Sequence, residues 1–231
     1  MLGSLFTDFT GTLISILLSL PGVILAVSVH ESAHGFVAWK LGDDTAKLSG
    51  RISLNPLRHV DPIGLLLLIL FRFGWARPVQ VNVRKFKKPR RDMCLVALAG
   101  PVSNILLSFL LVIASYAAAS FFTANYARFG DTTFSTVLEV LTHILEYAAV
   151  INAGLGVFNL IPIPPLDGWK VLGAFLPVKV YFTLMRYERI GMILLIALMI
   201  TGLLSGPMST AINAILDLEY GAVAKVASLF I

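Results

Sequence analysis

Two histidines and a glutamate stand together in an apolar stretch near the start of the chain. The stretch reads VSVHESAHGFVAW from Val27 to Trp39, and it contains His30, Glu31 and His34. Side chains four residues apart share one face of a helix, so both imidazoles can reach one metal ion. Glu31 projects beside them, where it can accept a proton from a water that the metal activates. Because ionisable groups are costly in apolar surroundings, this spacing favours a zinc site over a pair of packing histidines.

A hydrolytic zinc ion needs a third ligand from the protein, so one more residue must come from elsewhere in the chain. The candidates are His59, His143 and an acidic residue, of which Asp167 in NLIPIPPLDGWKV is the best placed. Three prolines between positions 162 and 165 must break the helix there, which lets an aspartate after the break turn toward a neighbouring helix. An ordinary cap of the next helix explains Asp167 equally well. Both interpretations stay open on the residues alone.

The composition is that of a membrane protein. Hydrophobic residues make up 57% of the 231 residues and charged residues only 13%, whereas a soluble domain carries about 25% charged residues. No basic segment precedes the first apolar run, so that run is predicted to remain as an anchor and not to be cleaved as a signal peptide. The single cysteine, Cys94, excludes an internal disulfide.

Uncharged segments long enough to cross a hydrocarbon core predict the transmembrane helices. We expect an all-α polytopic membrane protein of one domain over residues 1–231, with about four to six spanning helices. The predicted helices cover roughly residues 11–40, 93–122, 136–162 and 186–205. Residues 62–83 begin with a run too short to span and continue with an alternating pattern, which predicts a re-entrant segment with a short strand or hairpin. Residues 208–231 are predicted to form an amphipathic interfacial helix or a last span.

Lysine and arginine are distributed unevenly along the chain. Twelve of the eighteen lie between Lys40 and Arg91, and four more lie between Lys170 and Arg189. Segments with such an excess stay in the cytoplasm, which places the histidine cluster near the cytoplasmic side of a multi-pass protein in the cell membrane. The lipid bilayer is therefore an expected partner. Nucleic acid is not expected, because no basic nucleic-acid-binding fold accompanies the charge.

Four signatures resemble those of the site-2 protease family of intramembrane zinc metalloproteases, in the family's order. They are HESAH, GRISLNPLRHVDPIG, LAGPVSN and FNLIPIPPLDG. The short length, without a PDZ or CBS domain, is similar to the compact prokaryotic members. The resemblance implies that His30, His34 and Asp167 hold Zn²⁺ and that Glu31 is the general base. It also implies that Asn159 supports the substrate or the oxyanion.

Asn104, the asparagine of LAGPVSN, is the second predicted substrate-binding residue. It lies in a predicted core helix, where an asparagine can equally well form hydrogen bonds between helices. The sequence alone does not separate these two roles.

The resemblance implies a zinc-dependent endopeptidase that hydrolyses peptide bonds in or near transmembrane segments of membrane proteins, as in regulated intramembrane proteolysis. A transmembrane protein is then the expected substrate. The alternative is a membrane metal transporter or a metal-binding membrane protein without protease activity. A transporter would not require the glutamate inside the H-E-x-x-H spacing. A structural zinc site would be closed by four ligands, often cysteines.

Overall fold

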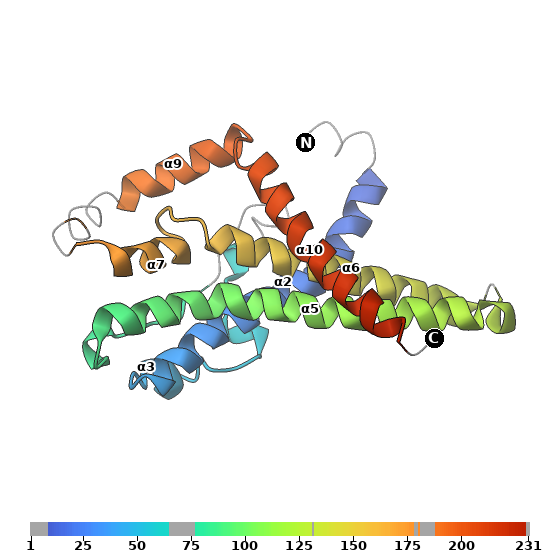
Figure 1. The fold of residues 1–231 in the computed structure, drawn as a ribbon, viewed down its shortest axis with the longest axis horizontal. Helices are drawn as coiled ribbons and strands as arrows, with labels where there is room; N and C mark the ends of the chain where they lie inside the picture. Colours follow the sequence, from blue (N-terminus) through green and yellow to red (C-terminus); the bar gives the residue numbers. More distant parts are fainter. Residues whose placement is uncertain (1–8, 65–76, 131, 178–179, 181–187, 230–231) are drawn as a thin grey trace.

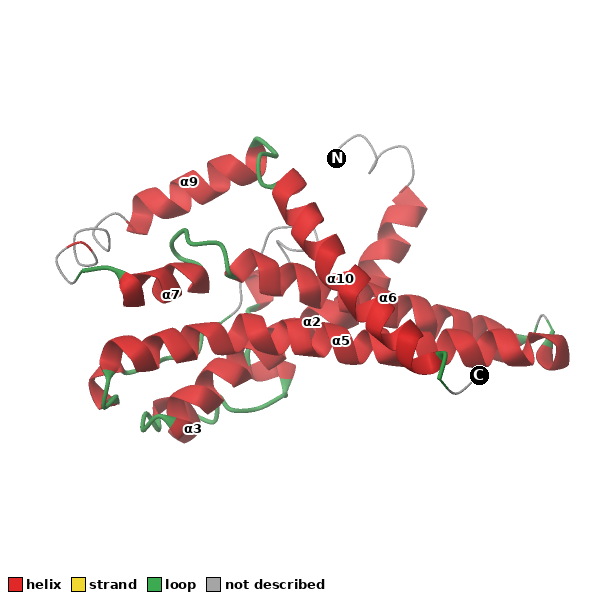
Figure 2. Cartoon of the chain, in the orientation of Figure 1, coloured by secondary structure: helices red, strands yellow, loops and turns green. Residues whose placement is uncertain are grey.

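The fold is that of a helical membrane protein. A computed structural model describes residues 9–64, 77–130, 132–177, 180 and 188–229, and the regular structure within them is helical apart from one isolated bridge residue, Val60 (Figures 1 and 2). Three segments are long and apolar enough to cross a membrane, at Ile14–Lys40, Pro89–Tyr126 and Thr133–Asn159. Two further helices, bent by 83° at a short break, make a fourth span if they are counted as one. The predicted all-α polytopic membrane fold is confirmed.

Three long helices carry the spanning segments. The spanning segments belong to α2, Phe9–Lys40, to α5, Pro89–Phe129, and to α6, Thr133–Asn159. The bent pair consists of α9, Glu188–Ile200, and α10, Ser205–Ala227, and α7, Asp167–Phe175, lies between α6 and this pair in the chain. Short helical turns lie between α2 and α5, namely α3, Thr45–Leu48, η1, Pro56–Arg58, and η2, Val83–Lys85.

The centre of the molecule is the contact between α5 and α6, which lie side by side, with α2 packed against both (Figure 1). Ala148 and Ala149 of α6 are buried against Leu111 and Val112 of α5. Small residues allow close approach between helices where lipid provides no hydrophobic driving force for their association. On the opposite side of α5 large apolar side chains are exposed, Leu106 by 60%. An outward apolar surface of this kind suits contact with lipid.

The C-terminal helix α10 docks on this centre. Leu216, Tyr220 and Val223 of α10 pack against the buried residues of α5 and α6. The buried carboxylate of Glu219 accepts a hydrogen bond of 2.8 Å from the hydroxyl of Ser108 on α5. The segment predicted as an amphipathic helix or a last span is therefore a helix attached to the core by both apolar and polar contacts.

Prolines determine where the central helices begin and end. The helix predicted from residue 93 begins earlier, at Pro89, because proline is well tolerated in the first turn, where its missing N–H is not needed. The helix predicted to end near residue 162 ends at Asn159, since the proline-rich loop after it cannot continue the helical hydrogen bonds. The helix predicted over 186–205 is described from Glu188 and ends at Ile200. It ends before Gly202, whose φ of 73° is left-handed.

The strand predicted in the segment 62–83 is not formed in its described part, and residues 65–76 lie outside the described residues. Residues 77–82 are extended, but Pro78 has no N–H to donate. The N–H of Val79 donates to Glu31 at 2.8 Å, and that of Asn82 donates to Asp43 at 2.6 Å. Side chains on or just after α2 thus take two of the backbone donors that a neighbouring strand would need, while the N–H of Arg77 donates to the backbone carbonyl of His59 at 2.8 Å.

Asp43 holds this extended segment against the end of α2. Its carboxylate is fully buried and also accepts hydrogen bonds from the N–H and hydroxyl of Thr45. Burial raises the pKa of the Asp43 carboxyl, but the hydrogen bonds from Thr45 and Asn82 outweigh burial and hold that pKa below its usual value. Asp43 is therefore ionised at neutral pH and keeps the segment in place.

Candidate metal centre

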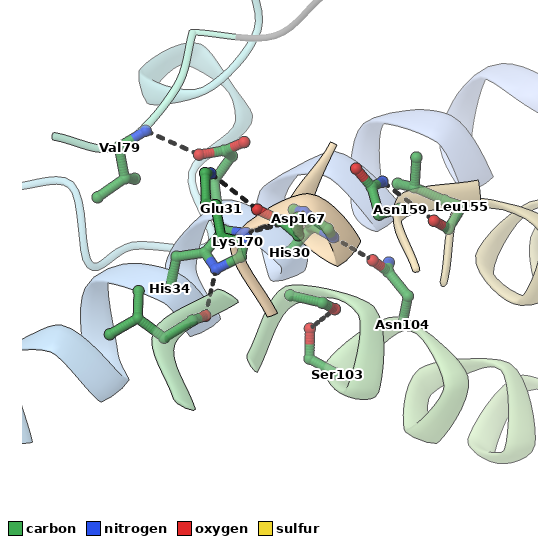
Figure 3. Close-up of polar contacts among 12 residues, drawn as sticks. His30, Glu31, His34, Val79, Ser103, Asn104, Leu155, Asn159, Asp167 and Lys170 are labelled. Carbon is green, nitrogen blue, oxygen red and sulfur yellow. Dashed lines mark hydrogen bonds and ion pairs between the residues drawn. The ribbon is translucent and has the colours of Figure 1, made fainter. Parts of the chain in front are cut away.

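His30 and His34 of α2 face Asp167, the first residue of α7 (Figure 3). The Nε2 atoms of the two histidines are 3.0 Å apart, and Oδ2 of Asp167 is 3.0 Å from each of them. All three side chains are buried, and they are the one set of three or more close candidate metal ligands that the described residues contain. The structure therefore brings together the three predicted zinc ligands, while metal binding itself stays a prediction.

The histidine rings are oriented by hydrogen bonds behind them. Nδ1 of His34 donates to the carbonyl of Val96 at 2.7 Å. Nδ1 of His30 lies 2.6 Å from Oδ1 of Asn104 on α5. A proton on Nδ1 leaves the electron pair of the imidazole on Nε2, which is the form that binds a metal.

The donor set fits zinc. Two imidazole electron pairs and a carboxylate oxygen converge at 3.0 Å from one another. Such acceptors repel one another unless a cation or a proton lies among them. Two nitrogens and one oxygen make a ligand set typical of hydrolytic zinc, which keeps a further position for water.

Gly100 of α5 keeps space beside the ligand atoms. A Cβ atom at this position would lie 2.5 Å from Nε2 of His34 and 2.6 Å from Nε2 of His30. Real Cβ atoms essentially never come closer than 3.0 Å to a neighbour. Any other residue at position 100 would therefore enter the space that an ion needs.

Asp167 is fixed from both sides. Gly168 lets α7 approach the preceding loop, because a Cβ there would lie 2.2 Å from the carbonyl oxygen of Leu160. On the other side, Nζ of Lys170 lies 2.9 Å from Oδ1 of Asp167. With Oδ1 paired to Lys170, Oδ2 is the oxygen presented to the two histidines. Asp167 is the first helical residue and not the N-cap, which is Leu166, and its carboxylate faces the two histidines and Lys170.

Glu31 lies in a cleft next to the histidines. Its Oε2 accepts the hydrogen bond from Val79, whose backbone belongs to the extended segment. The cleft has a volume of about 180 Å³, and Asn159, Lys170 and Pro78 are among the residues that line it with Glu31. A carboxylate that lines the cleft, with one oxygen held by the backbone, is placed to accept a proton.

A larger apolar cavity adjoins this cleft. It has a volume of about 780 Å³ and lies between α2, α6 and α9, with Val27, Phe158 and Leu195 among its walls. His30, Glu31 and Asn159 line the cavity as well. An apolar chain in the cavity would therefore be adjacent to the polar groups of the site.

The two predicted substrate-binding residues, Asn159 and Asn104, differ in their access to the cleft and the cavity. Asn159 ends α6 and lines both spaces, and its Nδ2 donates to the carbonyl of Leu155 at 3.0 Å. Asn104 is fully buried and lines neither space. Its hydrogen bonds reach His30, Ala26 and Asn152. This geometry favours an orienting role for Asn104, and its contact with substrate stays a prediction.

The other two histidines stand apart from the site. His59 is fully buried, and its Nε2 donates to the carbonyl of Ser53 at 2.7 Å. His143 is exposed on α6 and lies 3.2 Å from Glu146. Neither joins His30 and His34 in the described structure, which leaves Asp167 as the third candidate ligand.

Several site residues escaped the sequence analysis. Lys170 follows Asp167 by three residues, the spacing of a helical ion pair, and this spacing is a usable signal. Gly100, Asn152 and Val79 have no local signal, because each acts through a contact between segments far apart in the chain.

Comparisons with known proteins point to one family. The model of "Peptidase family M50" matches residues 19–202. "Putative zinc metalloprotease YwhC" of Bacillus subtilis (strain 168) is 39% identical over 195 residues, which cover 83% of this chain and 84% of that protein. "Putative zinc metalloprotease Rip2" of Mycolicibacterium smegmatis is 29% identical over 189 residues, covering 80% of this chain and 67% of that protein. No solved structure matches the chain at a significant level.

Proposed function

We propose that this chain, which belongs to peptidase family M50, is an intramembrane zinc endopeptidase. It is a metalloprotease by its family, and its curated relatives are named putative zinc metalloproteases. It would hydrolyse peptide bonds in or near transmembrane segments of membrane proteins. The observation that carries the proposal is the convergence of His30, His34 and Asp167 beside Glu31, within a helical membrane fold.

The roles of the residues follow from their positions. Bound zinc would polarise the scissile carbonyl and lower the pKa of a water from about 16 toward 7. Glu31 accepts the proton of the attacking water and then delivers it to the leaving amine. Val79 holds Oε2 of Glu31, so the other carboxylate oxygen exchanges the proton. One N–H of the Asn159 amide is not used by Leu155 and is available to a developing oxyanion.

The proposed substrate is a transmembrane protein. The apolar cavity between α2, α6 and α9 suits a hydrophobic segment, and its shared wall with the cleft would bring that segment to Glu31 and Asn159. A helical segment hides its carbonyls in hydrogen bonds, so it must unwind locally before cleavage. The uneven distribution of lysine and arginine supports a site near the cytoplasmic side of the cell membrane.

Glu31→Gln tests the proposal. The variant and the wild type are reconstituted in liposomes with zinc and a model transmembrane substrate, and cleavage and zinc content are measured. We expect Glu31→Gln to keep its zinc and to lose cleavage by at least about 10²-fold, as for a missing general base. The matched control is Glu139→Gln, which changes an exposed glutamate of α6 in the same way.

The same liposomes separate the alternatives. Cleavage by wild type and not by Glu31→Gln supports the protease. Zinc uptake into the liposomes without cleavage, unchanged in Glu31→Gln, would favour a metal transporter. Bound zinc with neither activity would favour a metal-binding membrane protein that is not an enzyme.

A further inference from the structure

We infer that Asn152 of α6 is a positioning residue that fixes the tautomer of His30 through the side chain of Asn104. The three residues lie on three different helices, α6, α5 and α2. The inference deepens the proposed function and rests on it, because it concerns how His30 presents its electron pair to zinc.

The orientation of the Asn104 amide follows from a backbone group. One end of this amide lies 3.0 Å from the carbonyl oxygen of Ala26. A carbonyl oxygen only accepts hydrogen bonds, so this end must be the NH₂ group, Nδ2. The second hydrogen of Nδ2 points to Oδ1 of Asn152 at 2.9 Å. The other end, Oδ1, then faces Nδ1 of His30 at 2.6 Å.

A backbone carbonyl also orients the amide of Asn152. Its Nδ2 lies 2.8 Å from the carbonyl oxygen of Ala148, one turn earlier on α6. Oδ1 of Asn152 is therefore the group that faces Asn104. Both asparagines are fully buried, so bulk water does not compete for these bonds. A reversed amide at either position would bring two acceptors together and leave buried polar groups unpaired, at a cost of about 1–3 kcal/mol for each group.

The chain of bonds ends at the metal site. Oδ1 of Asn104 is an acceptor, so Nδ1 of His30 must carry a proton. The electron pair of His30 is then on Nε2, the atom that faces Nε2 of His34 and Oδ2 of Asp167. If Asn152 were missing, one N–H of Asn104 would be buried without a partner, and the amide would be free to shift away from His30. Asn152 thus acts on the site without touching it.

Two variants of similar size test this role. Asn152→Leu removes the acceptor for Asn104, whereas Asn152→Asp in its neutral form keeps that acceptor and also a donor to the carbonyl of Ala148. We expect Asn152→Leu to weaken zinc binding about tenfold, the lower end of the effect of lost outer partners of metal ligands. Asn152→Asp should bind zinc within about twofold of wild type, since it preserves the bond to Asn104. Zinc affinity is measured by competition with a fluorescent chelator.

Ser108→Ala is the matched control. Ser108 is fully buried on α5 and also contacts α6, through the carbonyl of Ala149 at 3.0 Å. Its loss removes polar contacts of α5 with α6 and with Glu219 of α10, without touching Asn104 or His30. We expect unchanged zinc affinity in this variant.

The second measurement is the ¹⁵N–¹H NMR signal of the His30 Nδ1–H group in zinc-loaded protein. A short hydrogen bond to Asn104 gives a strongly downfield proton, which should move upfield in Asn152→Leu and stay in Asn152→Asp. Wild-type affinity and an unmoved signal in Asn152→Leu would overturn the inference. So would an Asn152→Asp variant as weak as Asn152→Leu. If Asn152→Leu does not fold, Asn152→Ala takes its place. A wild-type protein that binds no zinc would instead overturn the proposed function.

Discussion

Replacing Gly100 by alanine should abolish tight zinc binding while leaving the helices intact. The added Cβ would start 2.5 Å from Nε2 of His34 and 2.6 Å from Nε2 of His30, whereas ordinary contact begins at 3.4 Å. The histidine rings would therefore have to move by about 0.8–0.9 Å, and metal–ligand distances tolerate about 0.2 Å. Alanine favours a helix over glycine by about 1 kcal/mol, so the backbone of α5 has no reason to unfold.

We expect zinc affinity in Gly100→Ala to fall by more than about 100-fold, beyond the loss typical for an outer partner of a ligand. This factor corresponds to about 2.8 kcal/mol of binding free energy. Chelator competition gives the affinity, metal analysis gives the zinc content, and cleavage of a transmembrane model substrate gives the activity. Activity should fall with zinc content and return in part at high zinc concentration.

Two other glycines provide controls for Gly100→Ala. Gly154→Ala places its Cβ 3.6 Å from Ile212, an ordinary contact, and should change neither zinc binding nor stability by much. Gly22→Ala places its Cβ 2.7 Å from Ala148, away from the ligands, and should lower thermal stability with zinc affinity retained. Zinc binding as tight as wild type in Gly100→Ala, or zinc loss to the same extent in Gly22→Ala, would refute the steric role of Gly100.

Four further predictions concern the site, the extended segment and the orientation. Asp167→Ala should lose zinc on metal analysis, and undiminished zinc would remove Asp167 from the ligands. Asn159→Ala should cut cleavage about 10²–10³-fold with zinc retained, because one donor to the oxyanion is lost; zinc loss on metal analysis would make it a structural residue. Since the folded pKa of Asp43 is lowered, its support of residues 77–82 is present at neutral pH and is lost as the pH falls through that lowered pKa. Protection of the Asn82 N–H, relative to its intrinsic exchange rate at the same pH, should thus be reduced in Asp43→Asn at pH 7 but in wild type only at a pH below the ordinary pKa of an aspartate, and equal protection at pH 7 would contradict this. Lys87→Cys in a Cys94→Ser background should react with an impermeant thiol reagent only from the cytoplasmic side, and labelling from outside would reverse the orientation.

Local sequence patterns predicted the helices and, within the site, His30, Glu31 and His34. Uncharged runs mark spans because the bilayer excludes charge along a length of about 20 residues. His30 and His34 could be paired from the sequence because their spacing acts within a single turn of helix. Asp167 was different, since it lies 137 residues from His30. The residues alone left it open as a helix cap, and the family resemblance supplied its predicted role.

Contacts between distant segments account for what the sequence did not show. The alternating pattern near Val79 suggested a strand, but its backbone donors bind Glu31 and Asp43. Gly100 is required by the positions of two side chains on another helix. Asn152 matters through Asn104, and neither amide has an orientation until α2, α5 and α6 are packed. Such roles depend on packed geometry, which residue spacing along one chain does not encode.

The separation of His30 from Asp167 has a consequence for biosynthesis. The segment between them includes α5 and α6, so a ribosome that adds the 137 residues from Glu31 to Asp167 has already delivered two spans before the aspartate appears. At about 5–20 residues per second, this interval lasts about 7–27 s. During that time the nascent chain offers two histidines without the carboxylate that would complete the proposed site. A chain released early, before α7, would therefore be unable to assemble all three ligands, and proteolysis would begin only after the membrane core has been inserted.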